Sequence, residues 1–258
     1  MQGLHIINQF SPLLINLHTA TCLNSRLVTQ GRSSPIMSAP VIPISIVSDV
    51  VCPWCYVGIA QLQKAMRKFQ QSHPGASFKL TWHAFELNPD LDRISSTSPA
   101  PETVPVISKF DYLVSKFGRG VAERGSELLS QRAQAAGIEI NRSSGVIGPT
   151  KLVHEALIYA REKDKQTEFM LALFEAYFGK SENIFGKAGI IKVAATVDGL
   201  DVTELDDYLN SRKGNKVVEH EIKMNRYIGG VPHYTIGKYE VHGGQDADTF
   251  VKVFEHTM

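Results

Sequence analysis

Two cysteines separated by two residues, Cys52 and Cys55, are the side chains of this chain best suited to covalent chemistry. Apolar, β-branched residues over 41–47 precede them and predict a strand, and apolar residues at helical spacing follow and predict an amphipathic helix. The pair therefore lies where a strand ends and a helix begins. Because the free N–H groups and the dipole of a helix N-terminus stabilise an anion, we predict that Cys52 is a nucleophilic thiolate.

The two residues between the cysteines fit the same interpretation. Pro53 suits the first helical position, where its missing N–H costs nothing. Trp54 is expected to shield the thiols and to contact partners. Cys55, one turn further into the helix, is predicted to resolve a mixed disulfide formed on Cys52, as thiol–disulfide exchange requires.

Other uses of a Cys-x-x-Cys pair fit less well. A structural zinc site usually has four Cys or His ligands, but the only other cysteine, Cys22, lies near the N-terminus and no His-x3–5-His pattern follows. A structural disulfide across two residues would close almost no loop entropy. We therefore predict redox chemistry and no metal site.

The composition indicates a globular chain. Its 258 residues are 43% hydrophobic with a formal net charge of +1, which allows a substantial core and gives no basic surplus for nucleic acid. No run of 18 apolar residues occurs, so no membrane span is predicted. Neither nucleic acid nor membrane is therefore a predicted partner. Three cysteines favour a reducing compartment, and we predict a cytoplasmic protein. The sequence carries no signal for an oligomeric state.

The N-terminal segment differs in composition from the rest. Residues 1–48 contain no Asp or Glu and only two basic residues, Arg26 and Arg32. We interpret residues 1–40 as a leader or disordered tail, with a mitochondrial presequence or translation from Met37 as the alternatives. A secretory signal fits less well because no basic residue precedes the apolar run at 12–15.

The order of predicted elements indicates an α/β protein interrupted by a helical block. A strand at 78–82 is followed by a Pro- and Ser-rich linker at 92–105. Helices are predicted next, then a polar helix capped by Thr203, a hairpin and a last helix. The first helices are predicted at 107–117, 121–136, 151–163, 167–178 and 187–197. The polar helix spans 203–226, the two strands of the hairpin span 227–236 and 239–242, and the last helix spans 246–256.

Several motifs together resemble the DsbA family of thioredoxin-fold proteins, in its FrnE-like branch, over about residues 44–258. They are Asp49-Val50-Val51-Cys52-Pro53-Trp54-Cys55-Tyr56-Val57-Gly58, Phe85-Glu86-Leu87-Asn88-Pro89, Gly230-Val231-Pro232 and Gly243-Gly244-Gln245. The resemblance implies a thioredoxin-like fold with an all-helical insertion. Its parts would be residues 44–102, the insertion 103–200, and residues 201–258.

The resemblance also implies the makeup of the site. Cys52 would attack, and a cis peptide bond between Val231 and Pro232 would face the cysteines; a trans proline opening an edge strand is the alternative. His233 departs from the apolar or small residue usual there, and is expected either to accept a proton near the thiols or to cap the strand without chemistry. His154, on an insertion helix, is expected to shape the substrate groove.

These observations lead to a thiol-disulfide oxidoreductase acting on protein or small-molecule disulfides or thiols, with no bound cofactor and glutathione as a candidate redox co-substrate. The Pro53-Trp54 pair differs from that of strong oxidants, so the direction of electron flow stays open. The rival function is a glutathione-dependent isomerase or transferase acting on a small aromatic or polyketide-like molecule. It is suggested by the related 2-hydroxychromene-2-carboxylate isomerases and kappa-class glutathione transferases, which carry serine in place of the first cysteine. A non-catalytic binding module is the third possibility, against which both cysteines argue.

Overall fold

The computed structural model describes residues 41–91, 99–141 and 144–257. The segment interpreted as a leader or tail, residues 1–40, lies outside the described residues, as does part of the predicted linker. From residue 41 onward, the described residues belong to one compact unit.

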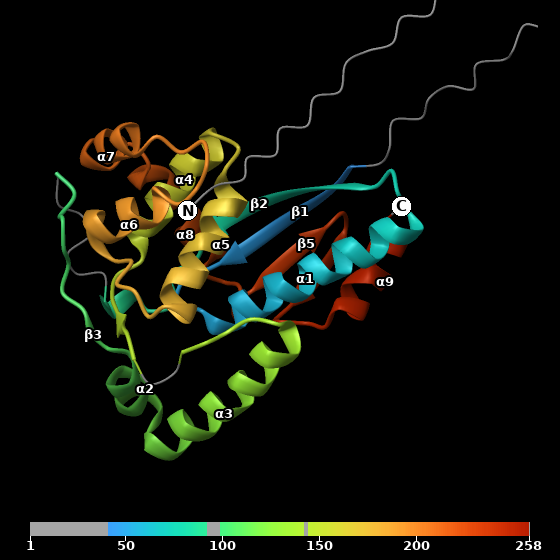
Figure 1. Ribbon diagram of the computed structural model, residues 1–258, viewed down its shortest axis with the longest axis horizontal. Helices are drawn as coiled ribbons and strands as arrows, with labels where there is room; N and C mark the ends of the chain where they lie inside the picture. Colours follow the sequence, from blue (N-terminus) through green and yellow to red (C-terminus); the bar gives the residue numbers. More distant parts are fainter. Residues whose placement is uncertain (1–40, 92–98, 142–143, 258) are drawn as a thin grey trace, which may run out of the picture. The chain divides into compact units, whose positions relative to one another are not determined.

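A four-stranded mixed sheet in the order β2-β1-β5-β6 forms the centre of this unit (Figure 1). Its central strand β1 (Val41–Ser48) pairs in parallel with β2 (Ser77–Ala84) and antiparallel with β5 (His233–Ile236). The last strand, β6 (Tyr239–His242), pairs antiparallel with β5. This is the mixed sheet of a thioredoxin-like fold, made by a chain that leaves the sheet after β2 and returns to it at β5.

Two helices pack side by side along one face of the sheet (Figure 1): α1 (Pro53–Ser72) and α9 (Ala247–Thr257). The helix α1 connects the parallel strands β1 and β2, as such a pair requires. Its apolar stripe, from Ile59 to Phe69, is buried because it faces the core. An α/β fold with the cysteines at the start of α1 follows from this arrangement.

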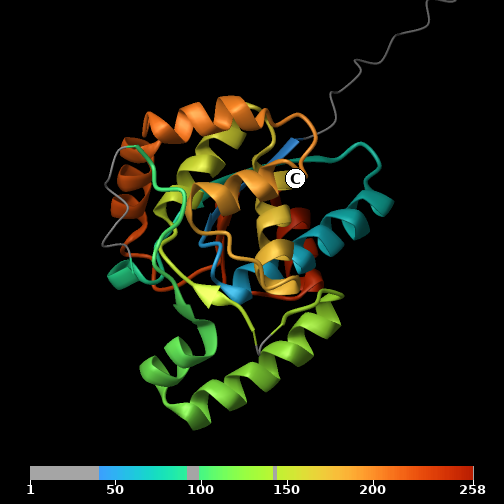
Figure 2. The ribbon, with the colours of Figure 1, turned by 60° about the vertical axis from the view of Figure 1, so that its left-hand side comes forward.

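The segment between β2 and β5 is mainly helical. Figure 2 shows α2 and α3 as a pair below α1, and both α2–α3 and α1–α3 are in contact. The segment also contains a two-stranded antiparallel sheet, β3 with β4, that the sequence did not predict. No helix of the described ranges is long and apolar enough to span a membrane. The bounds are η1 (Pro89–Leu91), β3 (Ile107–Ser108), α2 (Lys109–Phe117), α3 (Arg119–Ala136), β4 (Val146–Ile147), α4 (Lys151–Glu162), α5 (Gln166–Phe174), the π-helix η2 (Glu175–Gly179) and α6 (Gly186–Ala194).

The single polar helix predicted over 203–226 is wrong, because the chain forms α7 (Val202–Asn210) and α8 (Asn215–Asn225). Arg212 has a φ of 54°, a left-handed conformation that ends a helix. Its guanidinium forms an ion pair with the buried carboxylate of Glu155 on α4. The predicted cap at Thr203 is also wrong: Asp201 accepts hydrogen bonds from the backbone N–H groups of the first turn.

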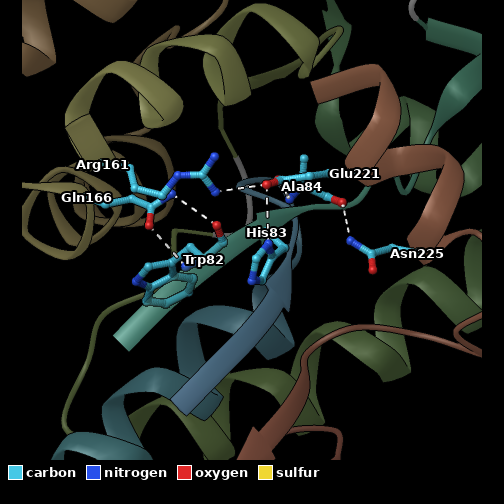
Figure 3. Close-up of polar contacts among 7 residues, drawn as sticks. All are labelled: Trp82, His83, Ala84, Arg161, Gln166, Glu221 and Asn225. Carbon is cyan, nitrogen blue, oxygen red and sulfur yellow. Dashed lines mark hydrogen bonds and ion pairs between the residues drawn. The ribbon is translucent and has the colours of Figure 1, made fainter. Parts of the chain in front are cut away.

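Side chains from the helical segment and α8 pair with the backbone of β2, the edge strand of the sheet (Figure 3). The amide of Gln166 bonds the Trp82 N–H and carbonyl oxygen, each at 3.0 Å. The Ala84 N–H donates to Glu221 at 2.8 Å, and its carbonyl accepts from Asn225 at 3.0 Å. Because an open edge strand invites pairing with other chains, these contacts close that edge.

Candidate active site

Cys52 occupies the position immediately before the first turn of α1. Its backbone is extended (φ −87°, ψ 110°), and its N–H donates to the Asp49 carbonyl oxygen at 3.0 Å. Pro53 begins the helix, and the Cys52 carbonyl accepts from the Cys55 N–H at 3.1 Å. No acidic residue lies in the first turn, so nothing there offsets the positive end of the helix dipole.

Both thiols are free and shielded from solvent. Cys52 is 3% exposed and Cys55 is 1% exposed. Burial raises the pKa of the Cys55 thiol well above its usual value, and the hydrogen bond and charge of Cys52 raise it further. Cys55 is therefore held as a thiol next to Cys52, the state expected of a group that acts second.

The loop before β5 meets the start of α1 at Val231 and Pro232. The peptide bond between them is cis, and the Cys52 thiol donates a hydrogen bond to the Val231 carbonyl oxygen at 3.4 Å. Gly58 permits this approach, because a Cβ there would lie 3.2 Å from Pro232 Cγ and would collide with the Tyr234 hydroxyl. The structure thus brings Cys52, Cys55, Val231 and Pro232 together.

Tyr234 belongs to this site, although the sequence did not single it out. Its ring is fully buried on β5, and its hydroxyl has no hydrogen-bond partner among the described residues. Burial raises its pKa, and charge on Cys55 and then on Cys52 raises it further. Strand alternation indicates that a tyrosine here is buried, but it cannot show that its hydroxyl points toward the cysteines.

His233 follows the cis bond directly and begins β5. Its imidazole is buried, and its Nδ1 lies 3.0 Å from Nδ1 of His242 on β6. Burial lowers the pKa of His233, and the charge of His242 lowers it further. The ring is therefore engaged across the β5–β6 pair.

His154 reaches the segment that precedes the cysteines. It is buried, with Nε2 3.0 Å from the Phe85 carbonyl oxygen and 3.5 Å from Asp49 Oδ1. The other oxygen of this buried carboxylate, Oδ2, accepts from the Leu87 N–H at 2.7 Å. His154 and Asp49 thus tie α4 to the loops after β1 and β2.

A cavity of about 410 Å³ adjoins the cysteine motif. Val51, Pro53 and Trp54 form the wall at the cysteine motif. Residues of α2, α3, η2 and β4, together with residues 87–88 and 140–141, form the rest. A larger hollow of about 700 Å³ lies between α1, α5 and α6 and does not include the motif. In the part of the chain that the structure describes, no group of three or more His, Cys, Asp or Glu side chains could hold a metal ion.

The comparisons with known proteins agree with this architecture. The family model of the DSBA-like thioredoxin domain matches residues 43–255. The chain therefore belongs to the DsbA-like thioredoxin family.

Individual relatives span nearly the whole of this domain. The uncharacterized protein YwbO of Bacillus subtilis (strain 168) is 28% identical over 213 residues, which cover 81% of this chain and 94% of YwbO. The probable DsbA oxidoreductase SCO1869 of Streptomyces coelicolor superposes with a TM-score of 0.69 at 25% identity, covering 84% of this chain and 89% of that one. A 2-hydroxychromene-2-carboxylate isomerase shares the fold, with a TM-score of 0.52 at 16% identity over 83% of this chain and 93% of its own.

Proposed function

We propose that the protein is a thiol-disulfide oxidoreductase that works through Cys52 and Cys55. The observation that carries the proposal is the position of two free, adjacent thiols at the N-terminus of α1, with the Cys52 thiol against the Val231 carbonyl. Membership of the DsbA-like family supports it. The substrate is a disulfide or thiol, and its direction of exchange depends on the reduction potential of the pair.

The proposed reaction follows from this geometry. The Cys52 thiolate attacks one sulfur of a substrate disulfide, forms a mixed disulfide and releases the other substrate sulfur as a thiolate. Cys55 then loses its proton and attacks the Cys52 sulfur, which releases the second substrate thiolate. The substrate gains two electrons, and the two cysteines lose two as their disulfide forms. The reverse sequence oxidises a substrate dithiol.

The step that is hardest for Cys55 is its deprotonation, because burial raises its pKa. A mixed disulfide on Cys52 would remove the hydrogen bond and charge that raise this pKa beyond the effect of burial, so Cys55 would ionise more readily after the first step. The arrangement therefore orders the two thiols in time.

Trapping the intermediate tests this proposal. The Cys55→Ser variant, incubated with oxidised glutathione, should accumulate glutathione on Cys52, whereas the unsubstituted protein should form the internal disulfide and release reduced glutathione. Cys52→Ser is the matched control and should accumulate neither glutathione on Cys55 nor an internal disulfide. Peptide mass locates each adduct, because Cys22 remains in both variants. Equal labelling of Cys52 in the first variant and of Cys55 in the second would contradict the assignment of roles.

A second candidate is a glutathione-dependent isomerase or transferase, favoured by the cavity next to the motif, whose volume suits a small molecule. Under this alternative Cys52 would activate or hold glutathione without an internal disulfide. Tight binding of reduced glutathione, together with no disulfide formation under oxidising glutathione buffers, would favour it over the first proposal.

A further inference from the structure

The charged side chains that line the cavity beside the cysteine motif are all positive. Its walls are mostly apolar and include Leu113, Leu129 and Phe178. Two lysines, Lys109 and Lys116, line it, whereas no aspartate or glutamate of the described residues does. Apolar walls with a few placed polar groups are typical of sites that bind small organic molecules.

Lys109 is a buried cation without an anionic partner in the described ranges. It is 9% exposed, and its ammonium lies 4.0 Å from the centre of the Tyr177 ring and 3.5 Å from the Tyr177 carbonyl oxygen. Burial alone lowers the pKa of Lys109 to about 8. A buried ammonium is costly unless it is paired, so this position is one that an anion would stabilise.

Lys116 lies seven residues further along α2, on the same face of the helix as Lys109. Its ammonium donates to the Asn88 side-chain oxygen at 2.8 Å and to the Tyr112 hydroxyl at 2.9 Å, both neutral groups that also line the cavity. The cavity thus presents two cations held by neutral partners.

The larger hollow near α5 and α6 shows the opposite pattern. Its lysines are neutralised: Lys165 pairs with Glu168, Lys180 with Glu175, and Lys192 with Glu182. Of these two cavities, the one at the cysteine motif is therefore the one that combines an apolar interior with unneutralised lysines.

We propose that this cavity binds a small, largely apolar organic molecule that carries an anionic group, with Lys109 and Lys116 holding the anion and Trp54 contacting the apolar body. This inference deepens the proposed function, because it names the class of substrate that the same site binds. It rests on the proposed function only in calling the bound molecule a substrate. Because Pro53 and Trp54 form one wall, such an occupant would lie beside Cys52.

A pair of probes that differ by their charge tests the inference. The anion 8-anilinonaphthalene-1-sulfonate and its neutral counterpart N-phenyl-1-naphthylamine share an apolar body, and binding of each is measured by calorimetry and by probe fluorescence on the full chain. We expect one site for the anion. The Lys116→Met and Lys109→Met variants should each weaken it about tenfold or more, because hydrogen bonds to charged groups are the strong ones.

Three controls define the outcome. Lys180→Met, in the larger hollow, should leave anion binding unchanged, and both cavity variants should leave binding of the neutral probe unchanged. Thermal unfolding checks each variant, and if Lys109→Met does not fold, the more exposed Lys116→Met decides the question alone. Anion binding by Lys116→Met that equals the unsubstituted protein's, or no anion binding at all, would overturn the inference.

The experiment also separates this inference from the proposed function. Anion binding measured on the Cys52→Ser variant, which cannot form the disulfide, should match that of the unsubstituted protein. If the trapping experiment fails while the anion still binds, the redox proposal is wrong and the binding site remains supported. If trapping succeeds but the anion does not bind, only the binding site is wrong.

Discussion

The Cys52 thiol donates a hydrogen bond to the Val231 carbonyl oxygen at 3.4 Å, across 179 positions of sequence. This contact joins the start of α1 to the loop before β5. A thiolate or a disulfide at Cys52 cannot donate, so under the proposed reaction either state would free the Val231 carbonyl. An extended substrate segment could then donate an N–H to it, as in strand addition.

The first prediction concerns the reactivity of the two thiols. In the reduced protein at neutral pH, iodoacetamide should modify Cys52 at least about tenfold faster than Cys55, because the raised pKa of Cys55 leaves little thiolate. Mass spectrometry of timed samples measures both sites. Raising the pH should narrow the difference, and equal rates at pH 7 would mean that Cys55 is not the silent partner.

The second prediction concerns the contact between Gly58 and Tyr234. Gly58→Ala should destabilise the protein by about 1–3 kcal/mol, because the added methyl group collides with the Tyr234 hydroxyl. Tyr234→Phe removes that oxygen, so the double variant should recover part of the loss. Urea unfolding of both single variants and of the double variant measures the coupling.

Gly120 provides the control for this cycle. It lies in α3, where an added Cβ meets only the flexible Arg124 side chain, so Gly120→Ala should stabilise by about 0.5–1 kcal/mol. Strict additivity of the Gly58 and Tyr234 substitutions would show that the two residues do not collide.

The third prediction concerns acid stability and Glu221. Burial raises the pKa of this carboxyl, but hydrogen bonds from His83, Arg161 and the Ala84 N–H outweigh burial and lower it from 4.5 to about 2. A depressed carboxyl pKa stabilises the fold above the unfolded value and loses that contribution as pH falls through the folded one.

The stability advantage of the unsubstituted protein over Glu221→Gln should therefore be full above about pH 5 and should shrink steadily toward pH 2. Urea unfolding at a series of pH values measures it. Glu219→Gln, an exposed position of the same helix, is the control. If the difference in unfolding free energy between the unsubstituted protein and Glu221→Gln stays constant from pH 6 to pH 3, the charge of the Glu221 carboxylate does not stabilise the fold.

The fourth prediction concerns the buried ion pair that separates α7 from α8. Arg212→Met should cost about 3–5 kcal/mol, because it leaves the fully buried Glu155 carboxylate without its cation. The neighbouring Lys213 pairs with Glu162 on the surface, so Lys213→Met should cost no more than about 1 kcal/mol. Thermal and urea unfolding compare the two variants; similar costs would contradict a structural role for the buried pair.

The parts of the fold that follow local pattern were predictable from sequence. The strand before the cysteines, the amphipathic helix after them and the β5–β6 hairpin depend on apolar periodicity and turn residues. The break between α7 and α8 has a local signal, the Asn, Ser and Gly residues at 210–215, which the prediction of one long helix passed over. What local pattern does not show is the ion pair of Arg212 with Glu155, a residue 57 positions away. The strand predicted from residue 227 begins only at His233, because Pro232 has no N–H for a ladder hydrogen bond and the Val231 carbonyl before it accepts from the Cys52 thiol.

The part of the candidate site that was predictable from the sequence is the part that lies in a single motif. Cys52 and Cys55 follow from their spacing and from the helix that begins at Pro53. Tyr234, Lys109 and Lys116 carry no motif. The structure reveals them, because the two lysines line a cavity with Pro53 and Trp54, and the Tyr234 hydroxyl lies next to Gly58 of α1. Long-range contacts of this kind leave no periodic signal in the sequence.

Whether Cys52 and Cys55 form a working redox pair is tested by an equilibrium titration of the protein in glutathione redox buffers, with the cysteine state determined by mass spectrometry. We expect a single two-electron transition to the Cys52–Cys55 disulfide. Its midpoint, read between about −270 mV for thioredoxin and about −120 mV for DsbA, gives the direction of exchange. A protein that remains a dithiol, or that stops at a glutathione adduct on Cys52, would not be a thiol-disulfide oxidoreductase acting through this pair.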